Sequence, residues 1–210
     1  MNMTEQQVFI VDDDEAVRDS MSMLLDTIDL PHRCFATAGE FLDFYDGTQR
    51  GCLVLDIRMP GMSGLELQQR LNHTNATLPI IFITGHGDIP MAVEAMRQGA
   101  LDFMRKPFRE QDLLDRIRQA LEHEAGTRDV LLDRAKILER IATLTAREHE
   151  VFERVTKGQA NKFIAIDLGI SERTVEVHRA QVMKKLDVRT LAQLVRVKID
   201  ADRPIHEPLR

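Results

Sequence analysis

The chain has 210 residues, of which 43% are hydrophobic and 30% are charged, the balance of an ordinary folded protein. This composition excludes a disordered chain, a collagen-like repeat and a disulfide scaffold, and no segment approaches the roughly 20 apolar residues of a membrane-spanning helix. The two cysteines, Cys34 and Cys52, match no metal-binding spacing, and no secretory signal is visible. We therefore expect reduced thiols and a cytoplasmic protein with no membrane partner.

The charge is unevenly distributed along the chain. Residues 1–125 hold 11 Lys or Arg and 21 Asp or Glu, for a net charge of −10. Residues 126–142 have a net charge of +1, and residues 143–210 have a net charge of +3. The first part would repel nucleic acid, whereas the last part would tolerate or attract it.

In the first 125 residues, short apolar or β-rich runs alternate with segments of helical spacing. This alternation predicts an α/β fold, a doubly wound parallel sheet with helices on both faces. The ligands of such sheets bind beyond the carboxyl ends of the strands. The predicted strands are 8–11, 33–36, 52–55, 79–84 and 101–104, and the predicted helices are 15–27, 38–45, 64–73, 89–98 and 110–123.

After residue 123 the strand signal stops and every segment is helical. Residues 126–142 are predicted to form a helical linker interrupted only by Gly126, with an apolar stripe that could pair two copies. Further helices are predicted to start at the capping box of Thr145, to cover 161–168, to run from Ser171 to about 186, and to cover 190–199. Two short helices joined at Gly169 are typical of a helix-turn-helix, so residues 143–200 are predicted to be an all-α, four-helix DNA-binding domain. Residues 201–210 are expected to be a frayed tail.

The polar residues at the predicted strand ends form one group. Because parallel strands end at one edge of a sheet, several carboxylates and one ammonium are expected to share a small volume there, which favours a bound Mg²⁺. A carboxylate beside that cation, a hydroxyl and a lysine is arranged to accept a phosphoryl group, with Asp56 as the nucleophile. The residues are Asp12, Asp13 and Asp14 after the first strand, Asp56 after the third, Thr84 on the fourth, and Lys106 on the fifth.

Each of these residues also has an ordinary structural explanation. Asp14 can simply cap a helix, Thr84 can simply favour a strand, and Lys106-Pro107 can be a surface turn. Their joint occurrence at the strand ends favours the functional interpretation.

Residues 6–125 resemble a response-regulator receiver domain, through residues 11–15, 56–64, 84–88 and 106–108. Residues 143–199 resemble a LuxR-type helix-turn-helix, through residues 144–148, Asn161-Lys162, Ile164-Ala165 and 173–179. The combination resembles the NarL/FixJ family of two-component transcription regulators, nearest the FixJ branch because of the segment 85–88. The resemblance implies a flavodoxin-like, five-stranded receiver of strand order 2-1-3-4-5.

For the receiver, the resemblance implies that a sensor histidine kinase phosphorylates Asp56. Mg²⁺ would be held by Asp12, Asp13, Asp56 and the backbone carbonyl of Arg58. Lys106 would pair with the phosphoryl group through a loop with a cis bond to Pro107. Thr84 and Phe103 would move on activation. Phosphorylation is then expected to drive homodimerisation through a surface that includes Val93, Arg97 and Asp102.

For the last domain, the resemblance implies that residues 171–186 form the recognition helix on a double-stranded DNA operator. Lys162, Arg173 and Thr174 are expected to touch phosphates, whereas Glu176, Val177 and Ala180 are expected to read base edges. Arg179 is a further candidate, His178 is either a phosphate contact or a packed residue, and Lys184 and Lys185 are either DNA contacts or a solvated helix end. RNA polymerase is a further candidate partner.

Three other classes of protein are disfavoured. An aspartyl phosphohydrolase would have a second Asp two residues after the nucleophile, where Arg58 stands, and would not need a helix-turn-helix. A flavodoxin-like binding module would place a phosphate-binding loop where three aspartates stand. A regulator that needs no phosphorylation would not require the aspartates, the threonine and the lysine at the strand ends. We therefore expect a regulator, not an enzyme.

Overall fold

The computed structural model describes residues 6–74, 76–85 and 89–203, which form two compact units divided between Arg128 and Asp129. Within these described ranges, no helix is long and apolar enough to cross a membrane.

A five-stranded parallel sheet forms the centre of the N-terminal unit. Its strands are β1 (Gln7–Val11), β2 (His32–Phe35), β3 (Gly51–Asp56), β4 (Ile80–Thr84) and β5 (Asp102–Arg105). Their order is β2-β1-β3-β4-β5, which confirms the predicted fold and strand order. In the register, Val11 lies beside Leu55 and Asp56 beside Ile83, so the carboxyl ends of the strands reach one edge together.

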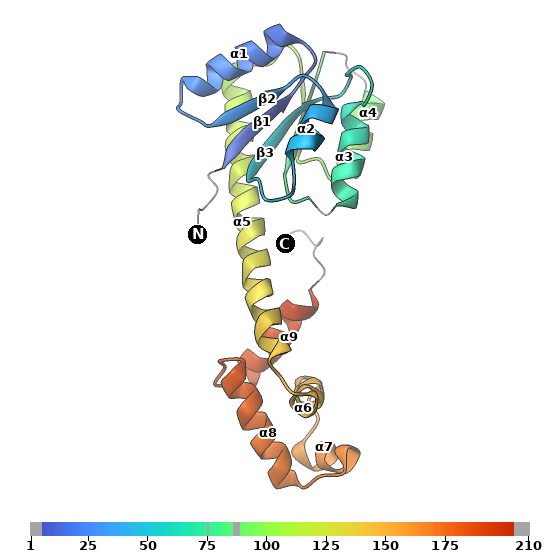
Figure 1. Ribbon diagram of the computed structural model, residues 1–210, viewed down its shortest axis with the longest axis vertical. Coiled ribbons are helices and arrows are strands. Elements are labelled where there is room, and N and C mark those ends of the chain that lie inside the picture. The colour runs from blue at the N-terminus through green and yellow to red at the C-terminus, as the bar shows by residue number, and fades with distance from the viewer. Residues whose placement is uncertain (1–5, 75, 86–88, 204–210) are drawn as a thin grey trace. The chain divides into compact units, whose positions relative to one another are not determined.

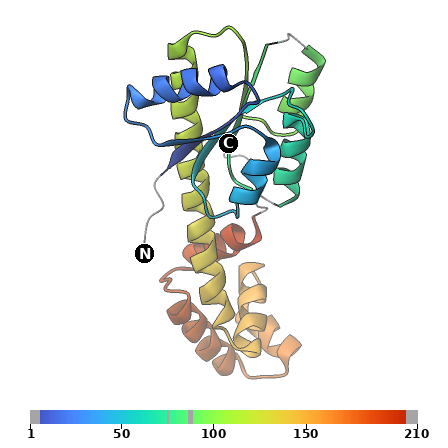
Figure 2. The same ribbon diagram turned by 45° about the horizontal axis from the view of Figure 1, so that its top comes forward.

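Helices cover both faces of this sheet (Figures 1 and 2). The helices α1 (Glu15–Asp26) and α5 (Glu110–Ala142) pack on one face, where Met21 and Ile117 belong to one buried apolar cluster. The helices α2 (Ala38–Phe44), α3 (Gly64–His73) and α4 (Ile89–Arg97) pack on the other, where Phe41 and Leu67 belong to a second cluster. β3 is buried along its whole length because helices cover both faces of the sheet. Side chains on both sides of this strand must therefore be mostly apolar.

The predicted interruption at Gly126 is wrong, because α5 (Glu110–Ala142) runs through it as one helix. A glycine inside a helix costs only about 1 kcal/mol relative to Ala. The neighbouring turn is anchored by Glu124, which is 2% exposed and accepts hydrogen bonds from Gln6 (2.6 Å) and Arg50 (3.1 Å). These contacts hold the helix where the isolated sequence pattern weakens.

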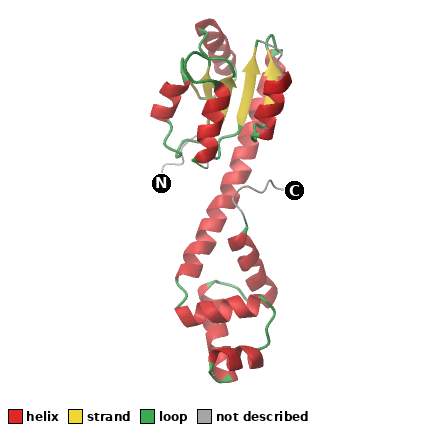
Figure 3. Cartoon of the chain, turned by 90° about the vertical axis from the view of Figure 1, so that its right-hand side faces the viewer, coloured by secondary structure: helices red, strands yellow, loops and turns green. Residues whose placement is uncertain are grey.

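The described residues of the C-terminal unit form helices and no strands (Figure 3). The rest of α5 is followed by α6 (Ala146–Thr156), α7 (Asn161–Leu168), α8 (Glu172–Lys185) and α9 (Leu191–Asp202). Thr145 and Ser171 cap α6 and α8 as predicted, and Gly169, with φ of 64°, ends α7 in the left-handed conformation that glycine favours.

The last helix is longer than predicted. α9 continues to Asp202, so the first residues of the expected tail are helical. Ala201 is buried, and its carbonyl oxygen accepts two hydrogen bonds from Arg134, at 3.1 and 3.2 Å, which stabilise the final turn. The remainder of that tail, residues 204–210, lies outside the described residues.

Candidate functional site

The carboxyl ends of three strands meet around one lysine. Asp12 follows β1, Asp56 ends β3, and Lys106 follows β5. The Lys106 Nζ donates to Asp12 Oδ2 at 2.6 Å and to Asp56 Oδ1 at 2.9 Å. Both carboxylates are buried, with exposed fractions of 1% and 6%. The structure thus brings together three of the residues predicted for phosphoryl acceptance.

The three consecutive aspartates have different environments. Asp12 Oδ1 accepts a hydrogen bond from the Asp14 backbone N–H at 3.0 Å, inside the site. The Asp14 side chain accepts from the Ala16 N–H at 2.9 Å and caps α1, which confirms the ordinary explanation for this residue. Asp13 is exposed.

The loop after β3 supports the second carboxylate. Asp56 Oδ2 accepts from the Arg58 backbone N–H at 2.7 Å, while Oδ1 faces Lys106. The start of α3 lies directly against this strand end, since a Cβ on Gly64 would stand 2.2 Å from the Asp56 carbonyl oxygen. This close approach requires a glycine at position 64. The sequence motif 56–64 includes this glycine, but the sequence alone gives no reason for it.

The predicted switch residues lie on the adjacent strands. Thr84 ends β4 and is 2% exposed, and its carbonyl oxygen accepts from the Lys106 backbone N–H at 2.8 Å. Phe103 on β5 is half-buried and packs against the apolar cluster under α2, α3 and α4. The bond between Lys106 and Pro107 is cis, as the resemblance implies. The segment 85–88 carried the resemblance to the FixJ branch, and its residues 86–88 lie outside the described residues.

The ionisation of the site follows from burial and from the shared lysine. Burial raises the pKa of Asp12, and the hydrogen bond from Lys106 offsets only part of that effect. Burial lowers the pKa of Lys106, but its bonds to Asp12 and Asp56 outweigh this and leave that pKa raised. The lysine is therefore charged, and two carboxylates share one positive charge.

The carboxylates of Asp12 and Asp56 suit a hard divalent cation, because they are acidic and offer only oxygen atoms as ligands. The structure assembles only part of the predicted set. Among the described residues, no three His, Cys, Asp or Glu side chains converge as a complete metal site. Asp12 and Asp56 come together, whereas Asp13 stays at the surface, so the predicted ligand set remains a prediction.

The second candidate site is the helix-turn-helix formed by α7 and α8. Val175 and Val182 of α8 are buried in the core of the C-terminal unit, as predicted for its inward stripe. Thr174, His178 and Arg179 are half-buried. The exposed residues of α8 include Arg173, Glu176, Val177, Ala180 and Lys184, and Lys162 is exposed on the first turn of α7.

Several contacts of these residues could not be read from the sequence. Arg179 donates to Asn161 Oδ1 at 2.6 Å and so joins α8 to the start of α7. Arg173 lies 3.7 Å from Glu176 in an exposed ion pair. Lys185 donates to Glu148 Oε2 at 2.6 Å, which lowers the pKa of Glu148. Lys185 therefore contributes to packing, while its neighbour Lys184 is free to face solvent.

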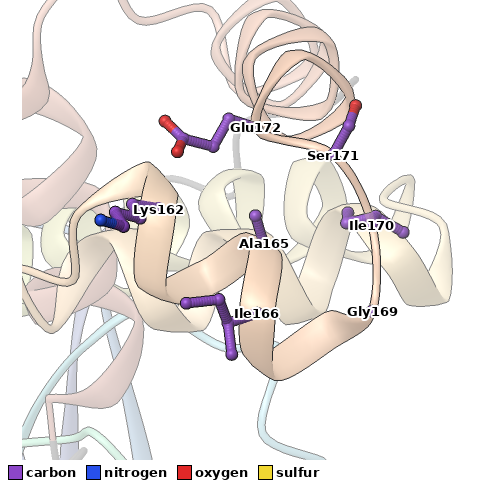
Figure 4. Close-up of a pocket in the computed structure, with 7 residues that line it drawn as sticks. All are labelled: Lys162, Ala165, Ile166, Gly169, Ile170, Ser171 and Glu172. Atoms are coloured by element: carbon purple, nitrogen blue, oxygen red, sulfur yellow. The ribbon is translucent and has the colours of Figure 1, made fainter.

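A hollow of about 540 Å³ lies in the angle between α7 and the start of α8. Figure 4 shows Lys162 and Glu172 on one side of it and Ile170 and Ser171 on the other. Its lining comes from both helices and from the turn at Gly169, so it belongs to the helix-turn-helix itself.

The predicted dimer surface lies on α4 and β5. Val93 is 46% exposed and Arg97 is exposed. Met96, which no sequence motif singles out, adds an apolar side chain that is 45% exposed. Asp102 is half-buried and forms an ion pair with Arg116 of α5, so its charge is engaged within the unit.

A doubly wound receiver-type sheet with paired acidic strand ends, joined in one chain to a helix-turn-helix, defines a class of DNA-binding signalling protein. Comparisons agree: residues 8–118 match the response regulator receiver domain, and residues 142–198 match the bacterial regulatory proteins of the luxR family. The chain belongs to the NarL/FixJ family of two-component response regulators with a LuxR-type helix-turn-helix, and it resembles the FixJ members.

The similarity extends over nearly the whole chain. It is 46% identical to the response regulator protein TmoT of Ectopseudomonas mendocina, covering 94% of this chain and 90% of that protein. It is 46% identical to the transcriptional regulatory protein FixJ of Azorhizobium caulinodans, covering 91% of each chain. The solved structure of the response regulator StyR matches with a TM-score of 0.80 at 46% identity, covering 93% of this chain and 98% of that one. The family consists of DNA-binding transcription regulators, and its receiver domain implies a histidine kinase partner.

Proposed function

We propose that this chain is a phosphorylation-dependent transcription regulator in which phosphoryl transfer to Asp56 controls dimerisation and operator binding. The observation that carries the proposal is the position of Lys106 between the buried carboxylates of Asp12 and Asp56. Residues 6–125 would be the receiver, 126–142 the linker and 143–200 the DNA-binding domain. The proposal implies a cytoplasmic protein, because its DNA partner lies there.

The chemical step is transfer from a phosphohistidine of the kinase. A carboxylate oxygen of Asp56 forms a bond to phosphorus as the phosphorus–nitrogen bond breaks, and the electron pair of that bond returns to the imidazole. The Lys106 ammonium already lies 2.9 Å from Asp56 Oδ1, so it can neutralise charge that arrives on the phosphoryl oxygens. The Arg58 N–H holds Oδ2 and fixes the orientation of the carboxylate.

Receiver domains generally bind Mg²⁺ for phosphorylation. Here Asp12, Asp13, Asp56 and the Arg58 carbonyl would hold it, and when bound it would offset negative charge on the phosphoryl oxygens. The residues of the chain supply the acceptor, the lysine and the shielding from water that follows from burial.

We propose that Thr84 and Phe103 transmit the change to the surface of α4 and β5. The exposed Val93, Met96 and Arg97 form a surface of mixed polarity, which suits a reversible two-fold contact better than an obligate one. Sedimentation should therefore show dimers of the phosphorylated protein that are weakened in Arg97→Glu. Dimers of unchanged affinity in that variant would contradict the assignment and direct attention to the exposed Leu138 of α5.

For DNA recognition, Lys162 and Arg173 would contact phosphates, and Glu176, Val177 and Ala180 would face base edges. Glu176→Ala should keep non-specific binding while discrimination among operator variants falls by about 1–3 kcal/mol at one position per half-site. A competition assay at fixed salt measures this. An unchanged ranking of variants would show that Glu176, which lies near Arg173, only pairs with that neighbour.

Intact-mass spectrometry tests the phosphorylation proposal. Wild type with Mg²⁺ and a small phosphodonor should gain one phosphoryl group, and Asp56→Asn should gain none. Asp43→Asn, which removes an exposed carboxylate of α2, is the matched control and should behave as wild type. Stoichiometric labelling of Asp56→Asn would refute the assignment.

A further inference from the structure

Arg18 reaches from the second turn of α1 to the backbone of the acidic loop. Its side chain is half-buried, and its Nη1 donates to the main-chain carbonyl oxygen of Asp12 at 2.8 Å. Lys106, by contrast, binds the side-chain carboxylate of the same residue. The hydrogen bond from the Arg18 side chain therefore goes to the backbone of Asp12 and not to a carboxylate of the site.

The other polar atoms of Asp12 are held as well. Its N–H donates to the Phe35 carbonyl at 3.3 Å, and Oδ1 accepts from the Asp14 N–H at 3.0 Å. The carbonyl bound by Arg18 is part of the peptide unit that joins Asp12 to Asp13. Because a peptide unit is planar, fixing its oxygen also fixes the direction in which Asp13 leaves the strand.

We propose that Arg18 is a positioning residue that orients the Asp12–Asp13 peptide for cation binding. This inference rests on the proposed function, since it assumes that Asp12 and Asp13 hold Mg²⁺. Residues that hydrogen-bond to metal ligands without touching the metal typically contribute about 10- to 100-fold to metal affinity.

A simple charge effect predicts the opposite sign. If Arg18 acted only as a nearby positive charge, it would repel a divalent cation, and its removal would tighten Mg²⁺ binding. If Arg18 orients the loop, its removal weakens binding although the site becomes more negative. The sign of the change in affinity therefore separates the two roles.

The test is calorimetric titration of the full chain with Mg²⁺, a direct readout in a protein that has no Trp. We expect about 10-fold weaker binding in Arg18→Met. Arg18→Lys, which keeps a charged donor, should recover much of the affinity. Arg70→Met removes an exposed cation of α3 and should match wild type. The unfolding midpoint in EDTA is recorded for each variant, and Arg18→Gln replaces Arg18→Met if the latter does not fold.

Equal or tighter Mg²⁺ binding in Arg18→Met would overturn the positioning role while the proposed function stands. Wild-type protein that binds no Mg²⁺ would overturn the proposed metal site and this inference with it. Mass spectrometry of the wild-type protein distinguishes these two failures, because it tests the phosphorylation of Asp56 independently of any change at Arg18.

Discussion

Replacing Lys106 by Met should destabilise the N-terminal unit in a way that depends on pH. The substitution keeps a side chain of similar length and removes the ammonium that lies 2.6 Å from Asp12 and 2.9 Å from Asp56. Two buried carboxylates then remain with no shared cation. Breaking a buried ion pair by removing one partner typically costs about 3–5 kcal/mol.

Protonation limits this loss. Burial already raises the pKa of Asp12 from 3.8, so Asp12 can take up a proton when its partner is removed. Because one pKa unit is worth about 1.36 kcal/mol, protonating a carboxyl with the ordinary pKa of 3.8 costs about 4 kcal/mol at pH 7 and only about 2 kcal/mol at pH 5. The loss of stability in Lys106→Met is therefore expected to be about 3–4 kcal/mol at pH 7 and about half that at pH 5.

Urea unfolding in EDTA, followed by tyrosine fluorescence, measures this loss of stability in the N-terminal unit. The chain has one Tyr and no Trp, and Tyr45 stacks on Phe41 inside the N-terminal unit. Arg105→Met, which removes an exposed charge from the neighbouring position, is the control. A loss below about 1 kcal/mol, or an equal loss at both pH values, would refute the shared-lysine geometry.

Three further outcomes are expected. Asp13→Asn should melt at a higher temperature than wild type in EDTA, since it relieves repulsion among the carboxylates, yet gain less from added Mg²⁺; equal gains in a thermal scan would make Asp13 a surface residue only. Arg50→Met should lose about 3–5 kcal/mol in urea unfolding because it leaves the charge of Glu124 buried with no cation beside it and only the neutral Gln6 as a partner, and Arg50→Met/Glu124→Leu should recover most of that loss. The bond from Lys185 lowers the pKa of Glu148, so the ionised carboxylate stabilises the fold above pH 4.5 and this contribution is lost as the pH falls below it. Glu148→Gln should therefore be less stable than wild type at neutral pH but equal to it in acid, as checked by far-ultraviolet circular dichroism.

The fold could be predicted from local signals because these agree with one another. Continuous apolar runs separated by helical segments are sufficient for a parallel sheet covered on both faces, and that topology by itself brings Asp12, Asp56 and Lys106 to one edge. The caps at Asp14, Thr145 and Ser171 could also be predicted, since capping depends on neighbours within three residues.

Features that depend on distant residues could not be predicted. Next to Gly126, the residue Glu124 of α5 forms an ion pair with Arg50, which is 74 residues away in the chain. The exposure of Asp13 between two engaged neighbours depends on how the loop turns into α1. The contact of Arg18 with the Asp12 carbonyl carries no sequence signal, because an arginine on a helix usually faces solvent.

The central claim is that a phosphoryl group on Asp56 switches on DNA binding. The most direct test is fluorescence anisotropy on a duplex selected from a random pool by the phosphorylated protein, at fixed salt with Mg²⁺. Addition of a phosphodonor should raise the affinity of wild type at least about 5-fold and leave that of Asp56→Asn unchanged. An unchanged affinity in wild type, or an equal rise in Asp56→Asn, would contradict the account.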